Sequence, residues 1–227
     1  MPTLNANFDL VIFDCDGVLV DSEVISCRAH AEVLTRHGYA ITADQVLDRF
    51  LGVSDREARM IIETELGRSL PGEFETEIKQ ATLRSYSSDL ISIPCVGEAI
   101  AAISLPKCVA SSGTPEKIRY GLTCAGLYDV LAPNIFSATQ VKHGKPAPDL
   151  FLFAARQMRA SPGRCVVIED SVPGVTGAVA AGMTVLGFHG GSHCRPGYAE
   201  TLRAAGATAT FDDMRRLPGL VARIDVE

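Results

Sequence analysis

The most continuous apolar segment near the start of the chain is Leu10–Phe13, within the stretch FDLVIFDCDGVLVDS. Consecutive apolar residues without alternation are typical of a parallel strand that is buried on both faces. This strand would deliver Asp14 and Asp16 into a turn that contains Gly17. If the extended backbone continues past the strand, the two carboxylates project to the same side, because side chains alternate along a strand.

A helical pattern follows from about residue 22 to residue 90. Apolar residues recur at helical spacing in four segments, which begin near residues 22, 42, 56 and 72. The chain then returns at Ile93-Pro94. We therefore expect residues 22–90 to form a small helical cap domain inserted after the first strand, and residues 1–21 and 91–227 to form a core domain. The alternative is an ordinary helical half of a single domain.

Strand and helix patterns alternate through the rest of the chain. Strands are predicted at 107–111, 135–138, 164–169, 184–188 and 208–211, and helices near 97–104, 115–126, 148–160, 173–182 and 196–205. This alternation predicts an α/β fold with a doubly wound parallel sheet. In such sheets ligands bind beyond the carboxyl ends of the strands, so only residues at those ends are candidates for chemistry.

Composition narrows the class of partner. With 227 residues, of which 47% are hydrophobic, the chain can bury a substantial core. A net charge of −6 disfavours nucleic-acid binding, so we expect a small-molecule partner, no nucleic acid, and a monomer or small homo-oligomer. Seven cysteines without a CxxC pair indicate thiols of a reducing compartment and predict a cytoplasmic location. The longest weakly polar run, 175–188, is too short and glycine-rich to span a bilayer, so no membrane association is expected.

The second predicted strand ends in VASSGTPEK. Ser111 and Ser112 precede Thr114, a good N-cap residue, and Pro115, which suits the first position of a helix. The start of a helix favours an anion such as phosphate. The same pattern also fits an ordinary capped helix.

Two further strand ends carry charged residues. The loop VKHGKPAPD contains Lys145, which could act as a positioned charge on a phosphoryl oxygen. The strand CVVIEDSVPG ends in Glu169 and Asp170. Oxygen ligands from Asp14 and Asp170 would suit Mg²⁺, although adjacent acids at a helix start can also be simple caps.

DCDGVLVDS, the two serines of VASSG, GKPAPD and IEDSVPG occur in this order along the chain. Together they resemble the four motifs of the haloacid dehalogenase-like (HAD) hydrolase superfamily, in its members with a helical cap after the first motif. The resemblance implies a Mg²⁺-dependent phosphatase that hydrolyses small organic phosphate monoesters through an aspartyl-phosphate intermediate. The implied roles are nucleophile for Asp14, general acid/base and backbone metal ligand for Asp16, phosphoryl binding for Ser111, charge stabilisation for Lys145, and metal binding for Asp170 with Glu169.

Residues also separate the possible activities within this superfamily. The stretch DCDGVLVDSEVISCRA resembles sugar-phosphate phosphatases that act on 6-phosphogluconate. Dehalogenases resembling this fold lack the second acid of the first motif, so Asp16 favours phosphate transfer. The related β-phosphoglucomutases carry cap cations that bind a second phosphate, whereas Ser26, Leu51 and Asp55 align with those positions here. A mutase and a non-catalytic phospho-ligand-binding protein remain the alternatives.

Discrimination between leaving groups is expected to come from the cap, because the core motifs would contact only the transferred phosphoryl group. The residues predicted near the leaving group are Glu23, Arg49, Gly52 and Arg56. An arginine here could pair with the carboxylate of a phosphorylated sugar acid.

Overall fold

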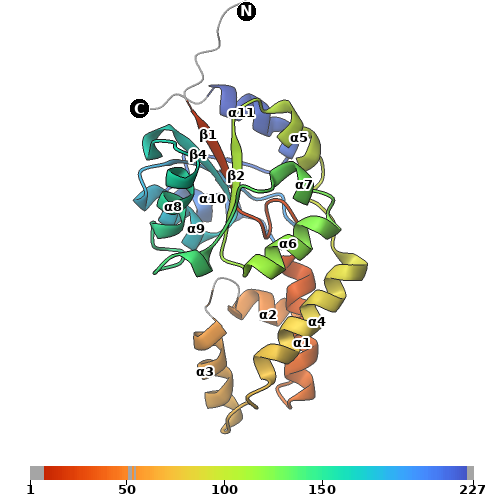
Figure 1. Cartoon of the computed structure of the whole chain (residues 1–227). Coiled ribbons are helices and arrows are strands. Elements are labelled where there is room, and N and C mark those ends of the chain that lie inside the picture. The colour runs from red at the N-terminus through yellow and green to blue at the C-terminus, as the bar shows by residue number, and fades with distance from the viewer. Residues whose placement is uncertain (1–7, 51–52, 54, 224–227) are drawn as a thin grey trace, which may run out of the picture. The chain divides into compact units, whose positions relative to one another are not determined.

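A six-stranded parallel sheet forms the centre of the fold (Figure 1). The structure is a computed structural model, and it describes residues 8–50, 53 and 55–223. The strands lie in the order β3-β2-β1-β4-β5-β6. Their bounds are β1 Leu10–Phe13, β2 Lys107–Ser111, β3 Ile135–Ser137, β4 Cys165–Glu169, β5 Thr184–Phe188 and β6 Ala209–Phe211. The predicted α/β fold with a parallel sheet is confirmed, and its predicted strand bounds hold to within one residue.

The continuous apolar run that predicted the first strand has a direct structural cause. β1 lies between β2 and β4, with Phe13 in register with Val109 on one side and Ile168 on the other. All four residues of β1 are buried, because helices cover both faces of the sheet.

Helices flank the sheet in two layers (Figure 1). On one face, Leu10 and Ile12 belong to an apolar cluster that includes side chains of three helices. These are α8 (Asp149–Gln157), α9 (Val172–Ala180) and α10 (Tyr198–Ala204). The opposite face is covered by α5 (Val96–Ala102), α6 (Pro115–Cys124), α7 (Tyr128–Leu131) and α11 (Leu217–Arg223).

Two of these helices, α7 and α11, were not predicted from the sequence. We predicted one helix over 115–126, but α6 ends at Cys124 and Gly126 takes a left-handed φ of 70°. The short helix α7 follows as a separate element. The helix α11 was not predicted at all.

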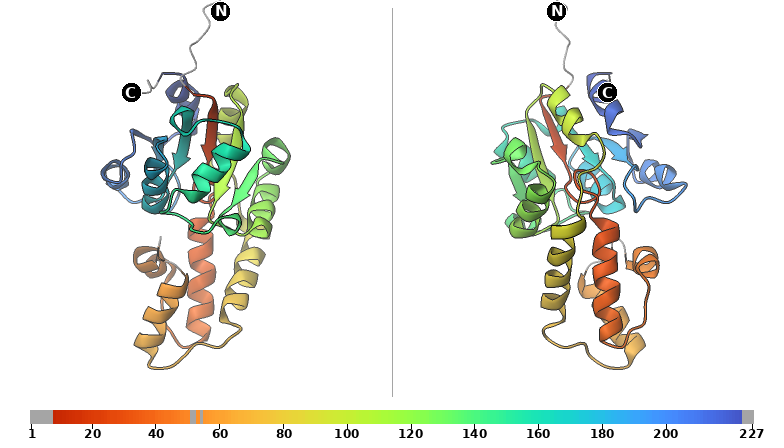
Figure 2. Two further views of the ribbon diagram at one scale, coloured as in Figure 1. Left: turned by 60° about the vertical axis from the view of Figure 1, so that its left-hand side comes forward. Right: turned by 90° about the vertical axis from the view of Figure 1, so that its right-hand side faces the viewer.

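Four helices between β1 and α5 form a bundle with its own core. They are α1 (Glu23–Arg36), α2 (Ala43–Phe50), α3 (Asp55–Leu66) and α4 (Phe74–Asp89). In both views of Figure 2, α1 and α4 run alongside each other. Val33, Leu34 and Phe74 belong to the buried cluster of this bundle. Of the helices described, none combines the length and the apolar composition that crossing a membrane would require.

Contacts divide the chain into two compact units, Met1–Asp21 with Ile91–Glu227, and Ser22–Leu90. We call them the sheet unit and the helical unit. The two connections between them pair with each other inside the sheet unit. Val20 and Ser92 form an antiparallel bridge, the N–H of Asp21 donates to the carbonyl of Ile91 at 3.0 Å, and the N–H of Ile93 donates to the carbonyl of Leu19 at 3.0 Å.

Candidate active site

Three neighbouring strands end at the same edge of the sheet, and each delivers candidate residues there. Ser111 is the last residue of β2, and Asp14 follows the last residue of β1. Glu169 is the last residue of β4, and Asp170 follows it. Since β2, β1 and β4 are adjacent and parallel, the topology alone brings residues that are far apart in the sequence to one place.

Lys145 joins two of these acids. Its Nζ donates to Oδ1 of Asp14 at 2.8 Å and to Oε1 of Glu169 at 2.6 Å, and the lysine side chain is only 4% exposed. The second oxygen of Glu169, Oε2, accepts from the N–H and hydroxyl of Ser171 at 2.9 and 3.0 Å. Both oxygens of Glu169 therefore already have protein donors, and Glu169 orients the lysine toward Asp14.

Burial dominates the electrostatics of this cluster. It raises the pKa of Asp14 well above its ordinary value, although the nearby ammonium of Lys145 opposes the shift. The pKa of Asp170 is raised for the same reason. Burial would lower the pKa of Lys145, but Asp14 and Glu169 outweigh it, so that pKa lies well above its ordinary value and the lysine stays charged. The cluster thus places three buried acids around a single lysine ammonium. This excess of acidic groups favours the binding of a further cation, such as a metal ion.

The acids fit a divalent metal ion. Asp14, Glu169 and Asp170 are all buried, and each offers an oxygen within 4.8 Å of the others. Hard carboxylate oxygens of this kind suit Mg²⁺.

The turn inside the first motif requires a glycine. Gly17 has a φ of 77°, and a Cβ at this position would lie 1.8 Å from Oδ2 of Asp170.

The second acid of the first motif has its own partner. β1 ends at Phe13, although the N–H of Asp14 still donates to the carbonyl of Ile168 in β4 at 3.0 Å. Asp16 accepts from Nζ of Lys117 at 3.1 Å, whereas Asp14 accepts from Lys145. The sequence analysis did not identify Lys117. Its position in the first turn of the helix after the serine motif is the signal that could have suggested it.

The serine motif has the predicted local structure. Ser111 is buried and its hydroxyl accepts from the N–H of Gly113 at 3.0 Å, while Ser112 is exposed. Thr114 caps α6 by accepting from the N–H of Lys117 at 3.3 Å, and Pro115 follows as the first helical residue. The predictions for the N-cap and the first helical position are confirmed.

The predicted cap residues lie in or beside the helical unit. Glu23 is the first residue of α1. Arg49, near the end of α2, donates to the hydroxyl of Tyr39 at 2.7 Å and to Oε1 of Glu65 at 2.6 Å. Gly52 lies outside the described residues, as does the side chain of Arg56. Arg49 would have to leave its partners in order to bind a substrate.

His193 is a second residue that the sequence analysis missed. It lies in the segment between β5 and α10, is 3% exposed, and its Nε2 is 3.0 Å from Oδ2 of Asp170. Burial would lower the pKa of His193, but the hydrogen bonds and charges of Asp170 and Cys194 together outweigh it and raise the pKa to about 11. No motif marked this histidine.

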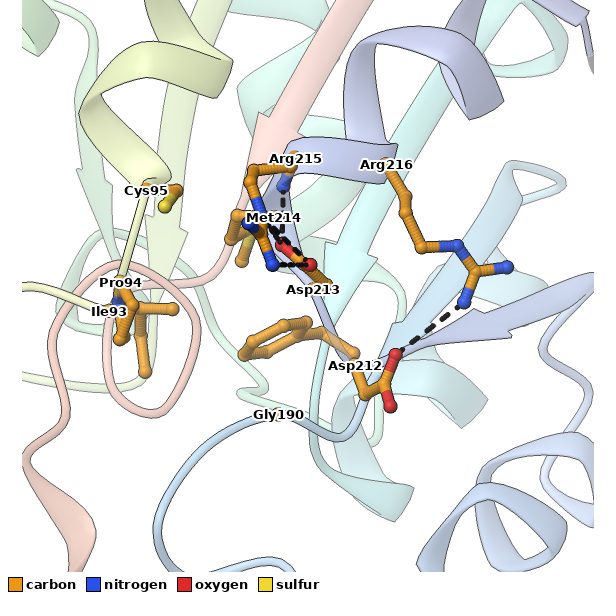
Figure 3. A pocket seen from close by; sticks show the side chains of 10 residues that line it. Ile93, Pro94, Cys95, Gly190, Asp212, Asp213, Met214, Arg215 and Arg216 are labelled. Atoms are coloured by element: carbon orange, nitrogen blue, oxygen red, sulfur yellow. Dashed lines mark hydrogen bonds and ion pairs between the residues drawn. The ribbon is translucent and has the colours of Figure 1, made fainter.

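An open cleft of about 430 Å³ lies elsewhere on the sheet unit (Figure 3). Its wall includes two arginines that are already paired. Arg215 donates to Asp213 over 2.5–3.0 Å, and Arg216 to Asp212 at 3.5 Å. None of the four sequence motifs lines this cleft, so we place the candidate active site at the strand ends rather than in the cleft.

Comparison with known proteins identifies the family of this chain. The model of the haloacid dehalogenase-like hydrolase family matches residues 8–182. The chain therefore belongs to this family of hydrolases. It is 32% identical over 192 residues to the 6-phosphogluconate phosphatase of Escherichia coli (strain K12), an alignment that covers 84% of this chain and 87% of the relative. Together with further phosphatases among its relatives, this makes the protein a phosphoric monoester hydrolase.

Solved structures support membership in the same family. A haloacid dehalogenase-like protein of unknown function from Agrobacterium tumefaciens str. C58 is 38% identical, with a TM-score of 0.85 and coverage of 95% of this chain and 98% of that one. A HAD family hydrolase from Deinococcus radiodurans R1, solved with bound phosphate and sodium, is 30% identical, with a TM-score of 0.78 and coverage of 94% of each chain.

Proposed function

We propose that this protein is a Mg²⁺-dependent phosphatase that hydrolyses small sugar or sugar-acid monophosphates through an aspartyl-phosphate on Asp14. The observation that carries the proposal is the buried contact of Asp14 with Lys145 at 2.8 Å, beside Glu169 and Asp170 at the ends of adjacent strands. A protein that only bound a phosphate would not need a carboxylate at this position, because like charges repel.

In the first step, a carboxylate oxygen of Asp14 attacks phosphorus. The new bond joins that oxygen to phosphorus, and the bond from phosphorus to the ester oxygen breaks. Asp16 gives its proton to the departing ester oxygen. Lys145 offsets the negative charge that gathers on the phosphoryl oxygens, and the hydroxyl of Ser111 donates to one of them.

In the second step, Asp16 acts as a base. It takes a proton from water as the water oxygen attacks phosphorus, and the bond between phosphorus and Asp14 breaks. Inorganic phosphate leaves, and both carboxylates return to their starting states. A Mg²⁺ ion held by Asp14, Asp170 and the backbone carbonyl of Asp16, with Glu169 near it or bound through water, would supply charge stabilisation for the phosphoryl group.

The proposed substrate class rests on the sequence of the helical unit and on the relatives. We propose that residues 22–90 act as a cap that selects the leaving group, with Glu23, Arg49, Gly52 and Arg56 as candidates for contact. The 6-phosphogluconate phosphatase of E. coli supports a sugar-acid phosphate as the first substrate to test. The phosphate bound in the D. radiodurans hydrolase supports a phosphate site in this fold.

The Asp14→Asn variant tests the proposal. The amide cannot attack phosphorus, so phosphate release from an aryl phosphate and from 6-phosphogluconate should vanish while the circular dichroism spectrum stays unchanged. Asp9→Asn is the matched control, because Asp9 lies on the same segment but pairs with Arg164 at 2.6 Å, outside the site. Wild-type turnover by a well-folded Asp14→Asn protein would refute the covalent mechanism.

The same assays separate the alternatives. If the wild-type protein binds phosphate esters but releases no phosphate, it is a binding protein. If it converts β-glucose 1-phosphate to glucose 6-phosphate without phosphate release, it is a mutase, and the proposed reading of the helical unit is wrong.

A further inference from the structure

The segment between β5 and α10 carries none of the predicted motifs, yet it contacts the acid cluster. His193 in this segment is buried, with Nε2 at 3.0 Å from Oδ2 of Asp170. Because a carboxylate oxygen accepts, the hydrogen of this bond lies on Nε2. The bond engages Oδ2 of Asp170 and restricts rotation of the carboxylate, so a cation would have Oδ1 as the oxygen that this bond does not use.

Main chain packs closely against the histidine ring. A Cβ on Gly191 would lie 2.8 Å from Cε1 and 2.9 Å from Nδ1 of His193, and a Cβ on Gly17 would lie 3.0 Å from Cε1. Nδ1 is buried and has no hydrogen-bond partner among the described residues. Among the described residues, the polar contacts of the ring are with Nε2, which meets Oδ2 of Asp170 and Sγ of Cys194, the latter at 3.4 Å. Packing thus determines the direction of the ring, and that direction is toward Asp170.

The segment is also tied to the loop that carries the first motif. The N–H and the hydroxyl of Ser192 donate to Oδ1 of Asp21 at 3.1 and 2.7 Å. The N–H of Cys194 closes a turn on the carbonyl of Gly191 at 3.0 Å. These bonds hold His193 in place relative to the loop of residues 14–21, so the histidine links two parts of the proposed metal site.

We propose that His193 is a positioning residue of the metal site, which acts by fixing the Asp170 carboxylate for the cation. This inference rests on the proposed Mg²⁺ site. A carboxylate ligand that is free to rotate must lose that freedom when the metal binds, whereas one that is already held does not. Loss of such an outer hydrogen bond typically weakens metal binding or activity by about 10- to 100-fold.

Metal binding without substrate provides the first measurement. Mn²⁺, a spectroscopic substitute for Mg²⁺, is titrated into the whole protein and free Mn²⁺ is followed by electron paramagnetic resonance. We expect His193→Leu, which removes the donor, to bind Mn²⁺ about 10- to 100-fold more weakly than the wild type. His193→Gln can place an amide N–H near the position of Nε2, so it should recover much of the affinity. His189→Gln is the control. His189 lies in the same segment, but in the described structure it makes no hydrogen bond or ion pair with Asp170.

Kinetics distinguish positioning from general damage. In His193→Leu the Mg²⁺ concentration for half-maximal phosphate release should rise in parallel with the Mn²⁺ result, whereas kcat at saturating Mg²⁺ should be largely retained. Melting curves without metal check that each variant is folded. A purely structural role would lower stability and kcat together and would not be rescued by glutamine.

Gly191→Ala gives a test that keeps the histidine. The added methyl group must displace the ring, so metal binding should weaken as in His193→Leu. In the His193→Leu background, where the bond to Asp170 is already lost, the same alanine should have little further effect on affinity, because the two changes act on one interaction.

The outcomes separate the inference from the function it rests on. Failure of the wild-type protein to bind Mn²⁺ would refute the proposed metal site itself. If the wild type binds and His193→Leu binds as tightly or more tightly, the metal site stands and the positioning role of His193 is refuted. Fully additive losses in the Gly191→Ala and His193→Leu pair would also overturn it.

Discussion

Nζ of Lys117 donates to Oδ2 of Asp16 at 3.1 Å, across a separation of 101 residues. The other acid of the first motif, Asp14, is bonded instead to Lys145. The two carboxylates are therefore bonded to different lysines, one in α6 and one in the loop before α8. This separation suits two different roles, a nucleophile and a proton carrier, in one short motif.

Replacement of Asp16 by asparagine is predicted to affect poor leaving groups most. Without a proton donor, hydrolysis of an alkyl phosphate should fall by about 10²- to 10⁴-fold, the usual worth of general acid–base catalysis. The aryl oxide of an aryl phosphate leaves without much help from an acid, so the aspartyl-phosphate should still form. It should accumulate, because the second step lacks its base. Rapid-quench detection of covalently bound phosphate measures this intermediate.

Lys117→Met is the matched variant, because it keeps the Asp16 carboxylate and removes only its ammonium partner. We expect a smaller loss of activity than in Asp16→Asn. Alkyl phosphates should again be affected more than aryl phosphates. An unchanged rate on alkyl phosphates in Asp16→Asn would remove Asp16 from the proton-transfer role.

Metal removal is predicted to abolish activity. A chelator should stop phosphate release, and added Mg²⁺ should restore it, because Asp14, Glu169 and Asp170 offer a compact set of hard oxygens. Ca²⁺ prefers more ligands and longer bonds, so it should restore activity poorly. Activity is assayed after dialysis against chelator, with each ion titrated separately. Full activity in chelator would contradict the metal assignment.

The arginines of the helical unit are predicted to influence substrate choice. Arg49→Ala and Arg56→Ala should raise KM for sugar-acid phosphates more than for neutral sugar phosphates, since an arginine can pair with a carboxylate. KM and kcat for 6-phosphogluconate and for a neutral hexose phosphate provide the comparison. Arg49 also bonds Glu65, so Glu65→Gln serves as a control for disturbance of the bundle. Equal changes for both substrates would exclude recognition of the carboxylate.

Acid is predicted to weaken the helical unit through Glu65. Hydrogen bonds from Tyr39 and then Arg49 lower the pKa of Glu65 below its ordinary value of 4.5. A carboxylate whose pKa is lower in the folded state stabilises that state above the ordinary pKa, and the contribution is lost as pH falls through the folded-state value. Thermal unfolding of the wild type and of Glu65→Gln from neutral to acidic pH should therefore converge below about pH 4.5. Parallel curves across this range would contradict the assignment.

The sequence was sufficient to predict the sheet and the motifs at its strand ends. Leu10–Phe13 is an unbroken apolar run because β1 is buried on both faces, and this cause acts within the segment itself. Asp14, Ser111 and Asp170 lie at the ends of such runs, so a parallel sheet places them at the same edge. The strand order β2-β1-β4 makes them neighbours there. The cap of α6 by Thr114 was likewise a local pattern.

The contacts of Lys117 and His193 could not be predicted in this way. The place of Lys117 in the first turn after the serine motif hints at a role, but it does not reveal the partner, Asp16, 101 residues away. The contact of His193 with Asp170 depends on the tertiary fold alone. The pairing of Arg49 with Glu65 and Tyr39 is similar, since it joins three parts of the helical unit. The short helix α7 was missed because it has only four residues, Tyr128–Leu131, too few to show a helical period of apolar residues in the sequence.

The paired connections between the two units have a consequence for how this fold can evolve. Residues 19–21 and 91–93 form a short antiparallel ladder, so the chain leaves and re-enters the sheet unit at neighbouring points. The segment from Ser22 to Leu90 therefore connects these two strands as the loop of a hairpin does. The entropy cost of closing such a loop grows only slowly with its length. The segment can therefore be shortened, lengthened or exchanged for another without changing the strand register, which lets one catalytic framework acquire new specificities by replacement of a single insert.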